Sequence, residues 1–198
     1  MNDVLPPDSL RGVRALITGS SRGIGADTAG YLAAAGAKVV INYRNKEARA
    51  LKVVAGIEER GGEAIAIGAD LTDPSSVATM FAEVRERWGG LDLLVLNASG
   101  GMESGLGEDY AMRLNRDAQV NVLDAALPLL GAGSRVVFVT SHQAHFIETV
   151  PTMPEYEPVA RSKRAGEDAL RARIPELEAA GVSFVVVSGD MIEGTITA

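Results

Sequence analysis

The sequence predicts a three-layer α/β/α fold, a single domain built on a doubly wound parallel sheet, and two observations carry that prediction. Short runs of Val, Ile and Leu alternate along the chain with longer helical patterns. Glycines follow most of these helical patterns, where a left-handed backbone conformation ends a helix. Uninterrupted apolar runs are typical of strands buried on both faces, and their alternation with helices is typical of a parallel sheet with crossover connections.

Each apolar run is a candidate strand, and each helical pattern a candidate helix. We expect strands at residues 14–18, 38–43, 64–69, 91–96, 135–140 and 183–188. We expect helices at residues 25–35, 46–60, 75–88, 109–130 and 159–180. Asp73-Pro74-Ser75 marks the start of the third helix, because proline is tolerated in a first helical turn. Ligands of such a sheet bind at the carboxyl ends of its strands, so the residues that follow the strands form the candidate site.

Length and composition bound the possible functions. At 198 residues the chain is expected to form one domain, residues 11–198, after an N-terminal tail, residues 1–10. A formal net charge of -7 argues against nucleic acid or an anionic membrane as the main partner. The sequence contains no cysteine, which excludes disulfides, and no apolar run approaches the roughly 18 residues of a membrane span. We therefore expect a soluble cytoplasmic protein.

The loop after the first strand carries three glycines. It reads Thr18-Gly19-Ser20-Ser21-Arg22-Gly23-Ile24-Gly25 and leads into the first helix. Glycine lets a backbone approach a ligand closely, and the unpaired N–H groups of a helix N-terminus point at an anion. The loop is therefore a candidate phosphate site, and the alternative is a glycine-rich turn without a ligand.

The residues after the second and third strands bear on the choice of coenzyme. A basic residue after the second strand accommodates the 2′-phosphate of NADP, whereas an acidic residue binds the 2′-hydroxyl of NAD. The chain has Arg44 there, and Arg22 offers a second guanidinium. NADP(H) is therefore expected, although both arginines could instead be solvated surface charges. Asp70 is a candidate acceptor for the adenine amino group, or a residue of the turn that caps the next helix.

Four motifs occur in the order found in short-chain dehydrogenases/reductases: Thr18-Gly19-x3-Gly23-x-Gly25, Asp70-Leu71, Asn97-Ala98-Ser99-Gly100 and Asn115. The chain resembles that family, and most closely its NADPH-preferring ketoacyl reductases. The resemblance implies a Rossmann fold, hydride transfer between a nicotinamide and a small carbonyl or alcohol substrate, and a homodimer or homotetramer. The cofactor-binding residues that it implies are Gly19, Ser21, Arg22, Gly23, Ile24, Gly25, Tyr43, Arg44, Asp70, Leu71, Asn97, Ala98, Ser99, Lys163 and Ile192.

The family usually uses a catalytic Asn-Ser-Tyr-Lys set, and three of its four positions match. Asn115, Ser141 and Lys163 stand at the asparagine, serine and lysine positions. The tyrosine position, four residues before the lysine, holds Val159, whose side chain cannot donate a proton. The nearest phenol is Tyr156, close to the face of Lys163 but about one helical turn too far along the helix.

The proton donor is therefore open at this point. Tyr156 is the first candidate, His142 and His145 are the next, and a protein with no dedicated acid is the remaining alternative. Two functions follow. One is an NADPH-dependent carbonyl reductase with a displaced donor; the other is an NADP(H)-binding protein without catalysis that serves as a sensor or subunit. Because relatives continue past the corresponding point, the C-terminal lid and the last strand are expected to be missing.

Overall fold

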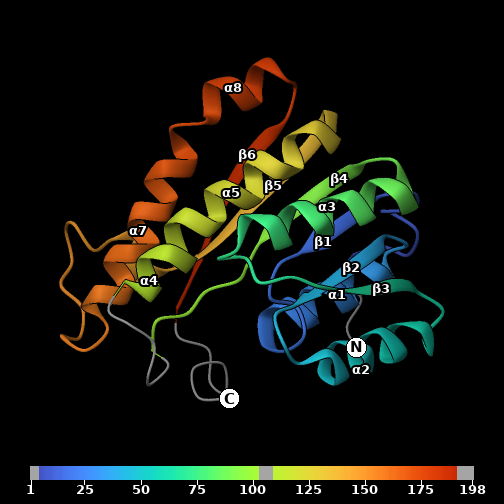
Figure 1. Ribbon diagram of the computed structural model, residues 1–198, viewed down its shortest axis with the longest axis horizontal. Coiled ribbons are helices and arrows are strands. Elements are labelled where there is room, and N and C mark those ends of the chain that lie inside the picture. The colour runs from blue at the N-terminus through green and yellow to red at the C-terminus, as the bar shows by residue number, and fades with distance from the viewer. Residues whose placement is uncertain (1–4, 103–108, 191–198) are drawn as a thin grey trace.

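The computed structural model describes residues 5–102 and 109–190. Within these residues a six-stranded parallel sheet lies between two layers of helices (Figure 1). Its strands are β1 (Arg14–Ile17), β2 (Lys38–Tyr43), β3 (Glu63–Gly68), β4 (Leu91–Leu96), β5 (Leu130–Ser141) and β6 (Ser183–Gly189). The strand order is β3-β2-β1-β4-β5-β6. From β1 the chain first adds strands on one side, β2 and β3, and then on the other, β4 to β6. The sheet is therefore doubly wound, and the predicted fold class is confirmed.

Each of the five expected helical regions contains helix, but the helix at His142–His145 was not expected and not every boundary agrees. The helical segments are α1 (Gly23–Ala34), α2 (Glu47–Glu58), α3 (Pro74–Trp88), α4 (Tyr110–Met112), the π-helical η1 (Arg113–Asp117), α5 (Ala118–Ala126), the 3₁₀ turn η2 (Leu127–Leu129), α6 (His142–His145), α7 (Glu157–Arg171) and α8 (Ile174–Ala179). No helix among the described residues is long and apolar enough to cross a bilayer.

Two predicted boundaries are wrong for identifiable reasons. The last expected helix, residues 159–180, is two helices, and Pro175 lies in the first turn of the second one. Proline lacks the N–H that a helix interior needs, so it begins α8 rather than continuing α7. β5 begins at Leu130, five residues before the expected start. The prediction missed this part of the strand because Gly131 and Gly133 interrupt its apolar pattern.

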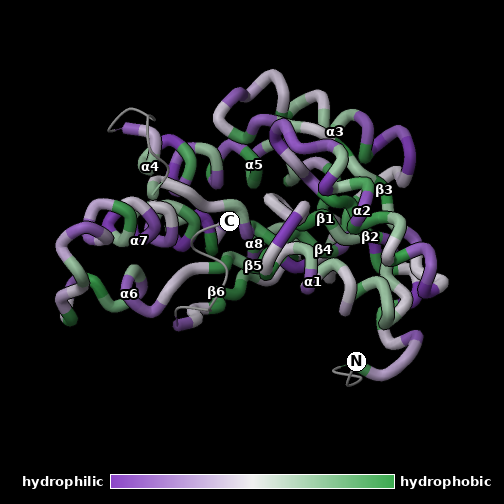
Figure 2. Tube along the Cα trace, turned by 90° about the horizontal axis from the view of Figure 1, so that it is seen from below, coloured by the Kyte–Doolittle hydropathy of each residue, from purple (hydrophilic) through white to green (hydrophobic). Residues whose placement is uncertain are grey.

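The sheet separates two apolar cores, as expected for strands buried on both faces. Figure 2 shows hydrophobic stretches of chain along the strands in the interior. One core joins Leu16 and Leu94 of the sheet to side chains of α3, α5 and α7, three helices that lie side by side. The other joins Ile17 and Ile41 to α1 and α2. Neighbouring residues Leu16 and Ile17 enter opposite cores because successive side chains of a strand point to opposite faces.

An ion pair ties β1 to β4 and the end of α3. The Arg14 guanidinium donates to both carboxylate oxygens of Asp92, at 2.8 Å each, and to the Trp88 carbonyl oxygen at 3.0 Å. Hydrogen bonding from Arg14 holds the pKa of Asp92 below its usual range. A carboxylate with a lowered pKa in the folded state stabilises the protein above the unfolded-state pKa, and this contribution is lost as the pH falls through the folded-state pKa.

Asp92→Asn should therefore lose less stability in acid than the wild-type protein does. Between pH 7 and about 4 the pair contributes to the wild-type protein, and below about pH 4 that contribution falls away. The free energy of unfolding of Asp92→Asn should accordingly depend less on pH below 4 than that of the wild type, measured by urea titration. Asp27→Asn, at an exposed carboxylate of α1, is the control and should leave the pH profile unchanged.

Candidate active site

The glycine loop lies against the carboxyl end of β4. Gly19 and Gly23 have φ angles of +63° and +53°, a left-handed region that favours glycine. A Cβ atom on Gly19 would lie 3.0 Å from the Ala98 Cα, and one on Gly25 would lie 2.6 Å from the Asn97 Nδ2. Gly19 and Gly25 are thus required by close packing within the protein, whether or not a ligand binds.

A polar network joins this loop to the segment after β4. The Thr18 Oγ1 accepts hydrogen bonds from the backbone N–H groups of Asn97 at 2.9 Å and Ala98 at 3.0 Å. In return, the Asn97 Nδ2 donates to the Thr18 carbonyl oxygen at 2.9 Å. These bonds fix the two loops at the point where the strand order reverses, which is where ligands of doubly wound sheets bind.

Two buried polar residues, Ser20 and Asn42, support the loop, and neither was predicted as a site residue. The Ser20 Oγ donates to the Ile17 carbonyl oxygen at 2.7 Å and accepts from the Asn42 N–H at 3.0 Å. The Asn42 Oδ1 accepts from the Gly19 N–H at 3.0 Å. A polar residue inside the apolar run of β2 is the signal that could have identified Asn42. Arg22 and Gly23 remain exposed at the start of α1.

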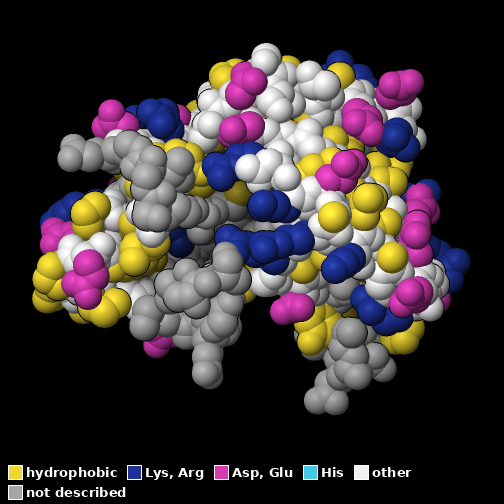
Figure 3. All heavy atoms as spheres, turned by 60° about the horizontal axis from the view of Figure 1, so that its bottom comes forward, with side chains coloured by type: hydrophobic (Ala, Val, Ile, Leu, Met, Phe, Trp, Pro, Cys, Tyr) yellow, Lys and Arg dark blue, Asp and Glu magenta, His cyan; other side chains and the backbone are white. Residues whose placement is uncertain are grey.

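Arg44 extends from the end of β2 toward α4. It is exposed, its Nη1 donates to the Tyr110 hydroxyl, and its Cζ lies 5.8 Å from the centroid of the Tyr110 ring. Figure 3 shows Lys and Arg side chains gathered in the middle of this edge of the molecule. Sequence reasoning missed Tyr110, because nothing in the local pattern marks a tyrosine as the partner of an arginine 66 residues earlier.

Asp70 takes part in a turn. Its Oδ1 accepts from the Thr72 N–H at 2.9 Å and the Thr72 Oγ1 at 2.7 Å, so the turn that the sequence allowed is present, and Leu71 is buried behind it. Tyr43, half-buried at the end of β2, lies against Gly68. Burial and the neighbouring Glu47 raise the pKa of Tyr43.

Ser141 and Tyr156 meet at the carboxyl end of β5. The Ser141 Oγ lies 3.1 Å from the Tyr156 hydroxyl oxygen, and it also accepts from the Ala144 N–H at 3.2 Å, which caps α6. Tyr156 immediately precedes α7, and its ring packs on a small apolar cluster that contains Ala144 and Ile147. The contact exists because α6 packs against α7.

Asn115 connects the segment after β4 to α7. It is 2% exposed, its Oδ1 accepts from the Gly100 N–H at 3.1 Å, and its Nδ2 donates to the Gly100 carbonyl oxygen at 2.8 Å and the Ser162 Oγ at 2.9 Å. Val159, which the resemblance places at the family's tyrosine position, is 4% exposed and packed near Gly101. Lys163 follows one turn later and is half-buried, with no hydrogen bond or ion pair to another described residue.

The two histidines differ in their surroundings. His142 is exposed beside Ser141, whereas the His145 Nδ1 lies 2.8 Å from the Glu167 Oε2. Within residues 5–102 and 109–190, neither ring hydrogen-bonds to Ser141. Ile192, expected beside the nicotinamide, lies outside the described residues.

A family model described as short chain dehydrogenase matches residues 14–198. The chain belongs to this family. It is 35% identical over 197 residues to the short chain dehydrogenase/reductase AacuN of Aspergillus aculeatus, covering 96% of this chain and 72% of that protein. It is 34% identical over 184 residues to the 1-cyclohexenylcarbonyl-CoA reductase of Streptomyces collinus, covering 90% of this chain and 64% of the relative.

Solved structures agree with this assignment. A short chain dehydrogenase from Burkholderia cenocepacia in complex with NADP has a TM-score of 0.80 at 39% identity, covering 90% of this chain and 74% of that one. The angucycline C-6 ketoreductase LanV with bound NADP has a TM-score of 0.79 at 30% identity, covering 90% and 72%. Family membership and these reductase relatives support an NAD(P)-dependent oxidoreductase activity.

Proposed function

We propose that the protein is an NADP(H)-dependent oxidoreductase that reduces a carbonyl group of a small molecule, or oxidises the corresponding alcohol, with Tyr156 as the proton donor. The observation that carries this proposal is the 3.1 Å separation of the Ser141 Oγ and the Tyr156 hydroxyl oxygen. A general acid must lie within hydrogen-bonding reach of the oxygen that it protonates, and Ser141 stands at the position that orients this oxygen in the family.

The residues present fit a dinucleotide. A Cβ at Gly19 or Gly25 would clash with Ala98 or Asn97, so the loop lies close to the end of β4. α1 begins after Arg22, and the first N–H groups of a helix have no acceptor within the helix, which suits a pyrophosphate at this point. Asp70 and Leu71 would border the adenine, and Asn97, Ala98 and Ser99 the central part of the coenzyme. The NADP complexes of the similar structures support the same ligand. When bound, NADPH supplies the hydride.

The catalytic side chains then have separate tasks. Ser141 binds the substrate oxygen, and the Tyr156 hydroxyl donates a proton to it as the carbonyl is reduced. Lys163, seven residues later, lies about 10.5 Å further along α7, so it holds the nicotinamide ribose rather than contacting the phenol closely. Asn115 acts through its bonds to Gly100 and Ser162, which keep the loop after β4 against α7.

Steady-state oxidation of NADPH against ketones and ketoacyl thioesters tests the proposal. The expected result is turnover with at least one substrate class, after binding of NADPH has been established by a rise in melting temperature. Bound NADPH without turnover across the panel would favour the alternative, a coenzyme-binding sensor or subunit, which the replacement of the usual tyrosine by Val159 motivates. In that case Ser141→Ala and Lys163→Ala would leave the cellular phenotype intact.

Arg44 is expected to decide between NADPH and NADH. Hydrogen bonds to a charged group contribute about 1.5–3 kcal/mol, so Arg44→Gln should raise the Kd for NADPH by roughly 10- to 150-fold. The Kd for NADH, which lacks the 2′-phosphate, should change little. Quenching of protein fluorescence or calorimetry measures both constants. Arg49→Gln, at an exposed arginine of α2, is the matched control and should leave both values unchanged.

The assembly is expected to be a homodimer or homotetramer formed through the helices that carry Asn115 and Lys163. Sedimentation equilibrium of the purified protein measures this directly.

A further inference from the structure

Glu167 is a carboxylate on α7 with no exposed surface, and the proposed reaction does not use it. Both of its oxygens are paired: Oε2 lies 2.8 Å from the His145 Nδ1, and Oε1 accepts from the Arg171 Nε at 2.8 Å. A buried carboxylate is costly unless it is paired and hydrogen-bonded, so these two contacts are a condition for its position.

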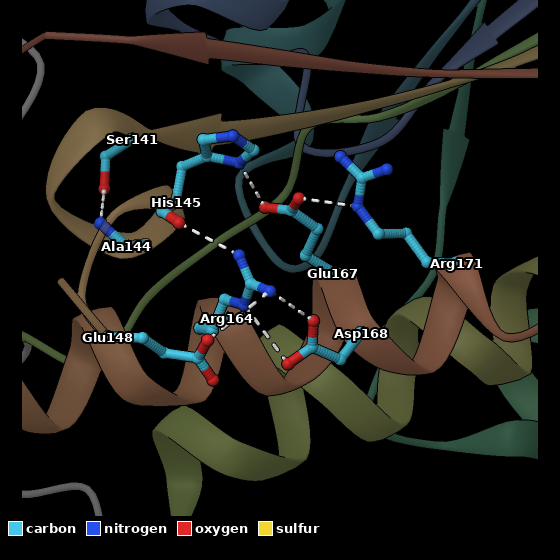
Figure 4. Close-up of polar contacts among 8 residues, drawn as sticks. All are labelled: Ser141, Ala144, His145, Glu148, Arg164, Glu167, Asp168 and Arg171. Carbon is cyan, nitrogen blue, oxygen red and sulfur yellow. Dashed lines mark hydrogen bonds and ion pairs between the residues drawn. The ribbon is translucent and has the colours of Figure 1, made fainter.

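His145 is held a second time through its backbone. The Arg164 Nη1 donates to the His145 carbonyl oxygen at 2.9 Å, and the same guanidinium pairs with Asp168 at 2.9 Å (Figure 4). The ring and the carbonyl group of one residue of α6 are thus both bound by side chains of α7.

The helix that ends at His145 is too short to hold its own orientation. α6 has four residues, and isolated helices shorter than about 12 residues are marginal in water. Its position therefore depends on its contacts with α7. These occur at both ends: Ser141, which caps the start of α6, contacts Tyr156, and His145, its last residue, contacts Glu167.

The proposed reacting groups Tyr156, at the N-cap of α7, and Lys163 lie on the same face of this helix as Glu167. Tyr156, Lys163 and Glu167 recur at helical spacing, with Glu167 one turn beyond Lys163. A shift of α6 along this face would change the distance between Ser141 and Tyr156 directly, because Ser141 is continuous with α6.

We propose that Glu167 is a positioning residue which, through His145, holds α6 so that the Ser141 Oγ stays within reach of the Tyr156 hydroxyl. The inference rests on the proposed function for its effect on turnover, but the positioning itself can be measured without turnover. Arg164 assists by binding the His145 carbonyl oxygen, and Arg171 neutralises the second oxygen of Glu167.

Two substitutions of His145 separate the effect of losing the hydrogen bond to Glu167 from the effect of losing the ring. His145→Leu removes the donor, whereas His145→Asn keeps an N–H donor near the location of the ring Nδ1. Misplacement of a reacting group by about 1 Å can cost up to about 100-fold in rate, so His145→Leu should lower kcat by roughly 10- to 100-fold. His145→Asn should recover most of the loss, and the Kd for NADPH should stay unchanged in both variants.

A readout that needs no turnover follows the phenol itself. The chain has four tyrosines, so protein labelled with 3-fluorotyrosine gives four ¹⁹F resonances, and loss of one signal in Tyr156→Phe assigns that residue. His145→Leu and Glu167→Gln should shift the Tyr156 resonance, whereas His145→Asn should restore it. Asp124→Asn, which breaks an ion pair with Arg173 far along the chain from α6, is the control and should leave it in place.

The outcomes distinguish the two proposals. An unmoved Tyr156 resonance in folded His145→Leu and Glu167→Gln, or a kcat that falls equally in His145→Leu and His145→Asn, would overturn the positioning role while leaving the reductase proposal intact. If His145→Leu does not fold, Glu167→Gln, which keeps the shape of the side chain, decides. A shifted resonance in a protein without any turnover would support the positioning role and count against the reductase.

Discussion

Replacing Tyr156 with phenylalanine is expected to lower kcat for carbonyl reduction by about 10²- to 10⁴-fold, the usual contribution of a general acid. The substitution removes only the hydroxyl oxygen that lies 3.1 Å from the Ser141 Oγ. The phenyl ring can still pack on Ala144 and Ile147, so the fold and the Kd for NADPH should be unaffected. Single-turnover loss of NADPH absorbance measures the chemical step, and fluorescence titration measures the Kd.

The control for this prediction is Tyr31→Phe, at a tyrosine of α1 that is 36% exposed. It should leave both kcat and Kd unchanged. Ser141→Ala and the double variant with Tyr156→Phe add a second check: residues that act as a unit give strongly non-additive losses, so the double variant should be little worse than Tyr156→Phe alone. Full activity in Tyr156→Phe would remove this phenol from the mechanism, and loss of activity in His142→Gln would then identify the donor.

Much of the fold was predictable because the apolar runs and the glycines agree. β2 and β4 span residues 38–43 and 91–96, the predicted ranges. The failures lie where local signals conflict with packing. Gly131 and Gly133 break the apolar pattern of β5, although Leu130 already pairs with Leu91 of β4 before the register shifts and pairing continues from Arg135. The π-helical turn around Asn115 was not predicted either; it packs against α7, a neighbour that local sequence does not reveal.

The candidate site divides in the same way. The glycine loop was recognisable because its conformation restricts which residues can form it, as the positive φ of Gly19 illustrates. The meeting of Ser141 and Tyr156 was not predictable, because helical spacing along α7 says nothing of the short helix α6 that approaches from the side. Glu167 was overlooked for a related reason: an Asp/Glu in a polar helix looks solvated until its neighbours are known.

Gly166→Ala is expected to have the largest effect on stability of any single methyl group added to α7. A Cβ atom at this position would lie 2.0 Å from the Asn115 carbonyl oxygen and 3.4 Å from the Arg116 Cα. Both neighbours are backbone atoms of the π-helical segment, so no side chain can rotate away. The two helices would have to separate, and a close-packed interior resists such a shift.

Overpacking of this kind typically costs 1–3 kcal/mol and occasionally more, which corresponds to a fall of roughly 2–12 °C in Tm for a domain of this size. The gain in helix propensity from glycine to alanine, about 1 kcal/mol, opposes this loss. Because both clashing atoms belong to the backbone, we expect the upper end of the cost, and hence a net fall of roughly 4–8 °C in Tm. Gly56→Ala in α2 isolates the propensity term, because its nearest neighbour is the flexible Arg60 side chain at 3.7 Å, and it should raise Tm slightly.

The same substitution should also slow the reaction beyond what the change in stability explains. α7 carries Lys163 and follows Tyr156, while Asn115 holds the Gly100 backbone next to the proposed coenzyme site. Moving α7 away from Asn115 would therefore separate the groups proposed to hold the coenzyme from those proposed to transfer the proton. We expect kcat of folded Gly166→Ala to fall at a temperature well below its Tm, whereas Gly56→Ala keeps wild-type kcat. Unchanged Tm and kcat in Gly166→Ala would mean that α7 can shift away from Asn115 without cost.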